Sequence, residues 1–486
     1  MPFNSIGFVV FLPIVFFFYW FVFGNNRKIQ NLFIVIVSYF FYACWDWRFL
    51  GLIAFCSMIN YFSGLGIENA GKDRSKKTIM RICSILSLGL LGVFKYFNFF
   101  IDTFIDSFAL FGIYLHPFSL KIILPVGISF YTFQSLGYTI DVYKNRIKAC
   151  RDIVAFFAFI SFFPQLLAGP IERANQFLPQ FFQVRRFDYL RTVGGLKQIL
   201  WGFFKKVVIA DRCAYFVDLV YGDVTSFSGS TLILVMLLYS FQIYGDFSGY
   251  SDIAIGTARL FGFSLKQNFA YPNFARDIAE FWRRWHISLT TWFKDYLYIP
   301  IGGSKGGLTM KIRNTFIVFF LSAFWHGADY SFLVWGVLNF IYFLPLLLRN
   351  KNRKNMEIVA LNRTLPTWKE VGSIMLTFLM VAFARIFFRA PSIWNAWLFI
   401  KGIFNPSLFS LPSMLGQNEN LHVLFLLFVL GVFTAIEWIG RMEQYAIETI
   451  GNGKSRLFRW IFYSLIIFVT GIYMQTGEMA FVYFQF

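Results

Sequence analysis

The sequence is poor in the residues from which disulfide frameworks and metal sites are built. Its 486 residues include only five cysteines and four histidines, and no two cysteines form a C-x-x-C pair. We therefore expect neither a disulfide framework nor a zinc site, and we expect no metal. The cysteines are interpreted as small apolar packing residues. They are Cys44, Cys56, Cys83, Cys150 and Cys213.

Acidic residues are also scarce: 25 carboxylates stand against 44 lysines and arginines, which gives a formal net charge of +19. The basic residues cluster in short gaps between apolar runs, a pattern that the positive-inside rule of membrane proteins explains without nucleic acid. Hydrophobic residues make up 57% of the chain, and 68 residues are phenylalanine. Apolar runs of about twenty residues recur, and they predict an all-α polytopic membrane protein surrounded by membrane lipids.

The apolar run Ser5–Phe23 has no basic residue before it and no cleavage site after it. We expect a first transmembrane helix there rather than a removed signal peptide. Basic gaps at 27–28, 72–81, 144–151 and 349–354 are assigned to the cytoplasmic side, which places the N-terminus outside.

The apolar runs predict about 11 transmembrane helices plus re-entrant helices, because several runs are too short to cross the hydrocarbon. Ile82–Phe94 and Phe97–Tyr114 are counted as separate runs. Neither an internal repeat nor a low-complexity linker divides the chain, so we expect one membrane domain over 1–486.

The stretch 279–307 differs from the rest of the chain by its arginines, tryptophans, histidine and glycines. Residues Phe281–Tyr298 are interpreted as one amphipathic helix with an aromatic stripe. Taken alone, that pattern equally describes a helix lying in the membrane interface with snorkelling arginines. The glycine-rich segment 302–307 is compatible with a phosphate-binding loop or a flexible turn. It is not a P-loop, because Leu308 stands where the lysine is required.

Two other polar features interrupt apolar segments. His326 ends the run Phe319–His326, and a buried neutral imidazole there can take a proton from a hydroxyl. The alternative is a histidine that only forms a hydrogen bond between helices. The segment 245–252 contains two aspartates and two serines, and we interpret it as a broken helix that lines a polar cavity.

Three segments closely resemble the membrane-bound O-acyltransferase (MBOAT) family, in its AlgI-like branch of alginate O-acetyltransferases, which includes peptidoglycan O-acetyltransferases. They are RRWHISLTTWF at 283–293, YLYIPIGG at 296–303 and WHG at 325–327. Further marks are FFYACWD at 40–46, PVGISFYTFQ at 125–134, AGPIER at 168–173 and FFRA at 387–390. The resemblance therefore runs nearly from end to end.

The resemblance implies a fold and a site. The MBOAT fold is a ring of tilted transmembrane helices around a thinned centre, with a central funnel that meets the buried histidine. His326 matches the family's catalytic histidine. His286 matches its second histidine, which is either catalytic as well or orients the substrate. The implied acyl donor is cytoplasmic acetyl-CoA, whose phosphates we assign to Arg283, Arg284 and Lys294 in the donor-side stretch 279–307.

The C-terminal aromatic tail, 481–486, is compatible with a terminal anchor at the membrane interface. It also resembles the tail of the small partner used in teichoic-acid D-alanylation. By that resemblance Tyr483 receives acetyl as an ester and passes it outward. A phenol, with a pKa of about 10, needs a base such as His326 for this step.

The predicted function is transmembrane O-acetyl transfer in the bacterial inner membrane. The acetyl group goes to a cell-envelope polysaccharide, either peptidoglycan or an alginate-like exopolysaccharide. A periplasmic or membrane-anchored SGNH-type acetyltransferase/esterase is the expected partner, and nucleic acid is not. Two alternatives remain: transfer of another acyl group, such as D-alanyl from a carrier protein, and a non-enzymatic transporter or flippase.

Overall fold

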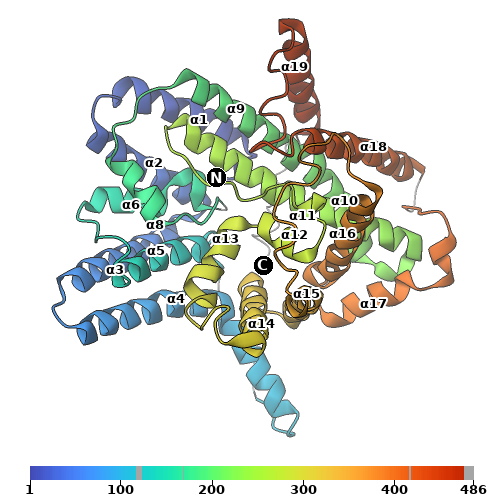
Figure 1. Ribbon diagram of the computed structural model, residues 1–486, viewed down its shortest axis with the longest axis horizontal. Helices are drawn as coiled ribbons and strands as arrows, with labels where there is room; N and C mark the ends of the chain where they lie inside the picture. Colours follow the sequence, from blue (N-terminus) through green and yellow to red (C-terminus); the bar gives the residue numbers. More distant parts are fainter. Residues whose placement is uncertain (116–122, 168, 415–416, 475–486) are drawn as a thin grey trace. The chain divides into compact units, whose positions relative to one another are not determined.

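A computed structural model describes residues 1–115, 123–167, 169–414 and 417–474, and every regular element in these ranges is helical (Figure 1). The chain divides into two compact units. The first comprises 1–192 with 257–266, and the second comprises 193–256 with 267–486. The expected all-helical class is confirmed.

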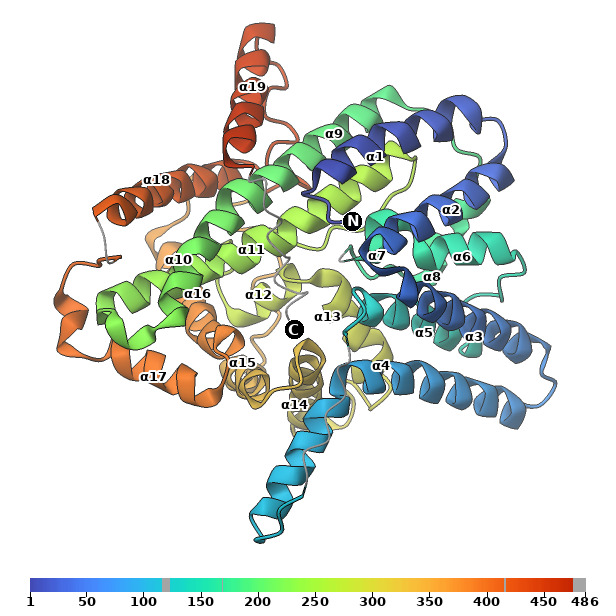
Figure 2. The same cartoon turned by 180° about the vertical axis from the view of Figure 1, so that it is seen from behind.

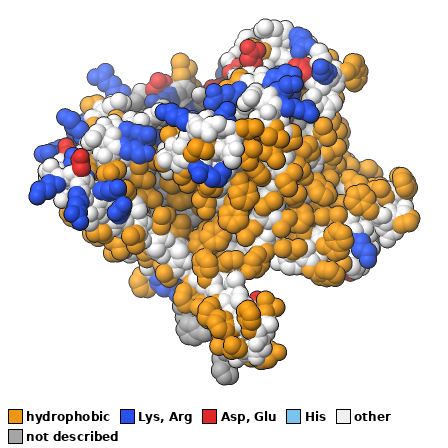
Figure 3. Space-filling model, turned by 60° about the horizontal axis from the view of Figure 1, so that its bottom comes forward, with side chains coloured by type: hydrophobic (Ala, Val, Ile, Leu, Met, Phe, Trp, Pro, Cys, Tyr) orange, Lys and Arg blue, Asp and Glu red, His pale blue; other side chains and the backbone are white. Residues whose placement is uncertain are grey.

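Seven helices of the described ranges are long and apolar enough to cross a membrane, and the shorter apolar helix Ile6–Val22 adds to them. The seven are Arg27–Asn69, Asp73–Ala109, Gly229–Leu260, Tyr330–Leu348, Trp368–Arg389, Asn418–Ile439 and Arg456–Tyr473. Figure 3 shows one face on which hydrophobic side chains form a broad surface, as lipid contact requires. The protein is thus a multi-pass membrane protein, although the predicted count of about 11 helices is not confirmed.

The first unit begins with α1 (Ile6–Phe17), α2 (Arg27–Asp46), α3 (Leu50–Asn69) and α4 (Asp73–Ala109), followed by α5 (Ile128–Tyr143) and α6 (Ile153–Ser161). Ser5, Asn26 and Asp152 cap α1, α2 and α6 by accepting backbone N–H groups of the first turn. The two apolar runs expected at 82–114 instead belong mostly to one helix, α4. Lys95 and Tyr96, which separate the runs in sequence, are compatible with an uninterrupted helix.

The short α7 (Phe163–Leu166) and α8 (Ala174–Phe177) complete this unit around a cluster of phenylalanines. Phe162, Phe177, Phe181 and Phe263 are fully buried and lie with ring centroids 4.7 to 6.1 Å apart. The high phenylalanine content is therefore used for interior packing as well as for lipid-facing surface.

The second unit contains most of α9 (Tyr189–Phe203), a π-helical turn (Phe204–Ala210), α10 (Asp211–Gly222) and most of α11 (Gly229–Leu260). The helix break predicted at 245–252 is wrong, because α11 is continuous there. Asp246 lies 2.7 Å from the Nζ of Lys206, and Asp252 lies 2.5 Å from the Nζ of Lys205. These lysines of the π-helical turn compensate the buried carboxylates, so the helix does not have to open to hydrate them.

The second unit continues with α14 (Gly307–His326), α15 (Tyr330–Leu348), α16 (Trp368–Arg389), α17 (Ile393–Ile403), α18 (Gln417–Ile439) and α19 (Arg456–Tyr473). Figure 2 shows α14, α15 and α16 as successive neighbours. The α14–α15 hairpin is tight: a Cβ on Gly336 would lie 2.4 Å from the Cβ of Ala323. Only glycine permits this approach, which fixes the helix that carries His326 at its end.

Candidate active site

The stretch predicted as one helix, Phe281–Tyr298, is broken at Trp285 and His286. The structure has α12 (Ile278–Arg284), α13 (Ile287–Phe293) and a π-helical turn (Lys294–Tyr298). His286 adopts a left-handed conformation with φ of 44°, which a continuous helix cannot contain. The aromatic stripe therefore does not lie along a single helix face.

Asn268 explains the break. Its carbonyl accepts the N–H of Ile287 at 2.9 Å, and its Oδ1 accepts the N–H and the hydroxyl of Ser288 at 3.2 and 2.9 Å. The N–H of Ala270 donates to the carbonyl of Arg284 at 3.0 Å. The segment 268–270 thus satisfies backbone groups that the interrupted helix leaves open.

His286 caps the second of these helices. Its Nδ1 accepts the N–H of Leu289 at 3.2 Å, and its ring lies 4.7 Å from that of Phe247. The side chain is 2% exposed, and burial lowers the pKa of His286 to about 3. The imidazole is therefore neutral at physiological pH. Because Nδ1 is the acceptor, the ring proton belongs on Nε2, which makes His286 a hydrogen-bond donor at that atom.

His326 ends α14 inside an aromatic cage and is 5% exposed. Its ring centroid lies 4.8 Å from Trp325, 5.2 Å from Trp335 and 5.2 Å from Phe388. Trp325 also lies 6.0 Å from the ring of His286. The structure thus brings the two predicted histidines to the same tryptophan, although they are forty residues apart in sequence.

A small cavity of about 10 Å³, close to the volume of one water, adjoins His326. Aromatic side chains enclose it together with Arg385 of α16 and Asn339 of α15. Sequence reasoning missed Arg385. The available signal was a lone arginine within the apolar run Ile374–Phe388, which is a functional-site candidate by default.

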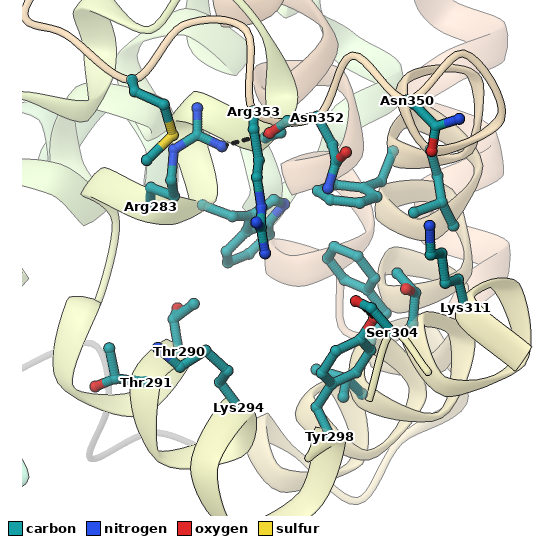
Figure 4. A pocket seen from close by; sticks show the side chains of 18 of the residues that line it. Arg283, Thr290, Thr291, Lys294, Tyr298, Ser304, Lys311, Asn350, Asn352 and Arg353 are labelled. Carbon is teal, nitrogen blue, oxygen red and sulfur yellow. Dashed lines mark hydrogen bonds between the residues drawn. The ribbon is translucent and has the colours of Figure 1, made fainter. Parts of the chain in front are cut away.

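A larger cavity of about 680 Å³ lies between α12, α13, α14 and the segment after α15. Figure 4 shows four cationic side chains around its open space: Arg283, Lys294, Lys311 and Arg353. Apolar side chains such as Val318, Phe319, Phe343 and Leu347 form its walls. Sequence reasoning assigned the first two cations and missed the others. Arg353 lies in the basic gap 349–354, whose charge pattern indicates only the cytoplasmic side of the membrane.

The three predicted donor-binding cations have different surroundings. Arg283 donates to the carbonyls of Asn352 and Asn355 at 2.7 and 2.8 Å, and so holds the segment that carries Arg353. The side chain of Lys294 is 60% exposed at the cavity. Arg284 forms an ion pair with Glu280 at 2.9 Å and is not among the residues that line the cavity.

Trp282 lines both cavities. Its ring lies 5.7 Å from Phe319 on the side of the larger cavity and 5.7 Å from Trp335, which in turn contacts His326. One indole therefore separates the cation-rimmed cavity from the small cavity at His326.

The glycine-rich segment forms a turn with positive φ at Gly302, Gly303, Gly306 and Gly307. Asn314 of α14 donates its side-chain N–H to the carbonyl of Gly303 at 2.9 Å, and Tyr298 and Ser304 share a hydroxyl hydrogen bond at 3.0 Å. Ser304 lines the large cavity. The turn is thus tied to α14 and contributes to the same cavity.

Tyr483 and the rest of the predicted tail at 481–486 lie outside the described residues. Within the described part of the chain, no group of three or more His, Cys, Asp or Glu side chains is arranged to hold a metal ion.

Comparison with known proteins places this geometry in context. The profile of MBOAT, the membrane-bound O-acyltransferase family, matches residues 148–388, which include both histidines and Arg385. A probable alginate O-acetylase AlgI of Pseudomonas aeruginosa is 36% identical over 86% of this chain and 78% of its own length. Its counterpart in Azotobacter vinelandii is 35% identical over 94% of this chain and 88% of its own length. A peptidoglycan O-acetyltransferase of Helicobacter pylori is 35% identical over 82% of this chain and 79% of its own length.

Proposed function

Because this chain belongs to the membrane-bound O-acyltransferase family and is an O-acyltransferase, we propose that it moves acetyl groups from cytoplasmic acetyl-CoA across the bacterial inner membrane. The final acceptor is a cell-envelope polysaccharide, either peptidoglycan or an alginate-like exopolysaccharide. The names of its relatives support both acceptors. One observation carries the proposal: the buried imidazole of His326 is one indole away from a cavity rimmed by cations.

The 680 Å³ cavity suits the donor, since small-molecule sites usually measure about 300 to 1,000 Å³. Phosphate groups pair well with Arg283, Lys294, Lys311 and Arg353, while the apolar walls accept the pantetheine arm. Arg284 supports this site indirectly, through Glu280 and the carbonyl of Ala270. The thioester then reaches His326 past Trp282.

His326 acts as the general base. It takes the proton from the acceptor hydroxyl as that oxygen forms a bond with the acetyl carbonyl carbon. The carbon–sulfur bond of the thioester then breaks, and the CoA sulfur leaves as a thiol with the proton that His326 returns. The neutral His286, as a donor at Nε2, orients groups on the other side of Trp325.

Tyr483 is the proposed first acceptor. Its phenol would carry the acetyl ester outward to a periplasmic or membrane-anchored SGNH-type partner, which would complete transfer to the polysaccharide. Intact-mass measurement of the purified chain after incubation with acetyl-CoA tests this relay. An acetyl adduct in the wild type but not in Tyr483→Phe is expected, and wild-type transfer by the variant would contradict it.

Membrane vesicles that contain the full chain, its SGNH-type partner and the polysaccharide acceptor test the function. Radiolabelled acetyl-CoA on the cytoplasmic side should give alkali-labile acetyl esters, and His326→Ala should abolish them. Full transfer by His326→Ala would refute the assignment. The same vesicles distinguish D-alanyl transfer, because a D-alanyl carrier protein would then replace acetyl-CoA as the competent donor.

A further inference from the structure

Among the described residues, one buried cation lines the His326 cavity, and donor binding does not explain it. Arg385 lies on α16, within a candidate membrane span, and is 4% exposed. Placing a guanidinium at such a position costs several kcal/mol, so arginines in membrane spans usually have a function.

The contacts of Arg385 fix the plane of its guanidinium. Its Nη1 donates to the carbonyl of Ser240 on α11 at 3.3 Å. Its Cζ lies 4.5 Å from the ring centroid of Trp285 and 5.6 Å from that of Phe281. Stacking on aromatic faces is a favourable environment for arginine and orients its guanidinium.

This oriented cation and the imidazole of His326 line the same small cavity. Trp282, Trp335 and Phe388 enclose it, and its volume of about 10 Å³ leaves room for about one water. In so dry a space a fixed positive charge acts on a developing negative charge with little solvent screening. The cavity thus combines a base with a permanent cation, which is what addition to a carbonyl group needs.

We propose that Arg385 is a catalytic residue that stabilises the oxyanion of the acyl-transfer step; this role rests on the proposed function. As the acceptor oxygen bonds to the thioester carbonyl carbon, the carbonyl π electrons move onto its oxygen. The N–H groups of Arg385 donate to that oxygen. When the carbonyl re-forms, the electron pair expels the CoA sulfur, which takes the proton held by His326.

Arg441 provides a matched control within the same unit. It is 7% exposed, and its Cζ lies 4.2 Å from the ring centroid of Trp438. Its donors bind the carbonyls of Val359 and Ala360 at 3.0 and 2.8 Å. It does not line the His326 cavity. Arg441 is therefore, like Arg385, a buried arginine that packs against a tryptophan, but it takes no part in the proposed reaction.

The test measures acetyl transfer from acetyl-CoA to the polysaccharide by the full-length chain, in the vesicles of the functional assay. The wild type and His326→Ala are run alongside. Arg385→Ala should lower kcat by about 10²- to 10³-fold, the usual effect of removing an oxyanion donor, with little change in KM for acetyl-CoA. Guanidinium chloride at millimolar concentration should restore part of the lost rate. Arg441→Ala should gain nothing from guanidinium.

Arg385→Lys and Arg385→Met are second variants if the alanine variant does not fold. Lysine keeps the charge and should retain more activity than methionine, although it lacks the planar fork. The role of Arg385 would be overturned by an undiminished kcat in Arg385→Ala or Arg385→Met. It would also be overturned if the alanine variant folds and guanidinium does not restore its lost rate. In either case, wild-type transfer that still depends on His326 would leave the proposed function standing.

Discussion

Acidification should destabilise this protein through His286. Burial lowers the pKa of His286 to about 3, against 6.5 for a solvated histidine. Between these values the unfolded chain binds a proton at this position and the folded chain does not. The free energy of unfolding is therefore undiminished above pH 6.5 and falls as the pH falls towards 3.

The magnitude follows from the size of the shift. Each pKa unit corresponds to about 1.4 kcal/mol. A pH of 5 lies about 1.5 pH units below the pKa of a solvated histidine. His286 alone should therefore lower the free energy of unfolding by about 2 kcal/mol at this pH. Near pH 3 the loss should be about 4 kcal/mol, and it levels off at about 5 kcal/mol at lower pH.

His286→Gln tests this prediction, because glutamine retains a polar acceptor and does not titrate. Unfolding of detergent-solubilised protein is measured at pH 7.5 and pH 5 for the wild type and the variant. The wild type should lose about 2 kcal/mol more than the variant over this interval. His422→Gln, at an exposed position on α18, is the matched control and should keep the wild-type pH dependence. Equal pH dependence in the wild type and His286→Gln would refute the reasoning.

Three further changes test the packing around the site. Trp282→Ala removes the wall between the two cavities. It should raise the amount of CoA released for each acetyl ester formed, and an unchanged ratio of CoA to ester would contradict this. Asp252→Asn removes the carboxylate that forms the ion pair with the buried Lys205 and should cost about 3–5 kcal/mol of unfolding free energy. The loss should be smaller when Lys205→Met and Asp252→Leu are combined. Gly336→Ala should cost about 1–3 kcal/mol in thermal unfolding, and Ala323→Gly in the same chain should relieve it.

The fold class could be predicted because it depends on composition and on the length of apolar runs. The burial of His326 could also be predicted, since it follows a run of apolar residues within one helix. Both are local properties of the sequence.

The helix break at His286 could not be predicted in this way. The aromatic periodicity continues across it, and the groups that stabilise the break come from Asn268, eighteen residues earlier. The break expected in α11 failed for the opposite reason. Asp246 and Asp252 interrupt an apolar run in sequence, but Lys205 and Lys206 on a separate turn compensate them. In both cases tertiary partners overrode the local pattern.

The break also explains how one short stretch serves two cavities. Trp282 separates the cavities, Arg283 holds the segment that bears a cation of the larger one, and Trp285 supports the guanidinium of Arg385 beside the smaller one. At His286 the backbone adopts a left-handed conformation and α13 begins. Thr290 and Thr291 of α13 line the larger cavity again. The proposed donor cavity and the proposed catalytic cavity therefore share one structural support, so that a shift of α12 should change both together.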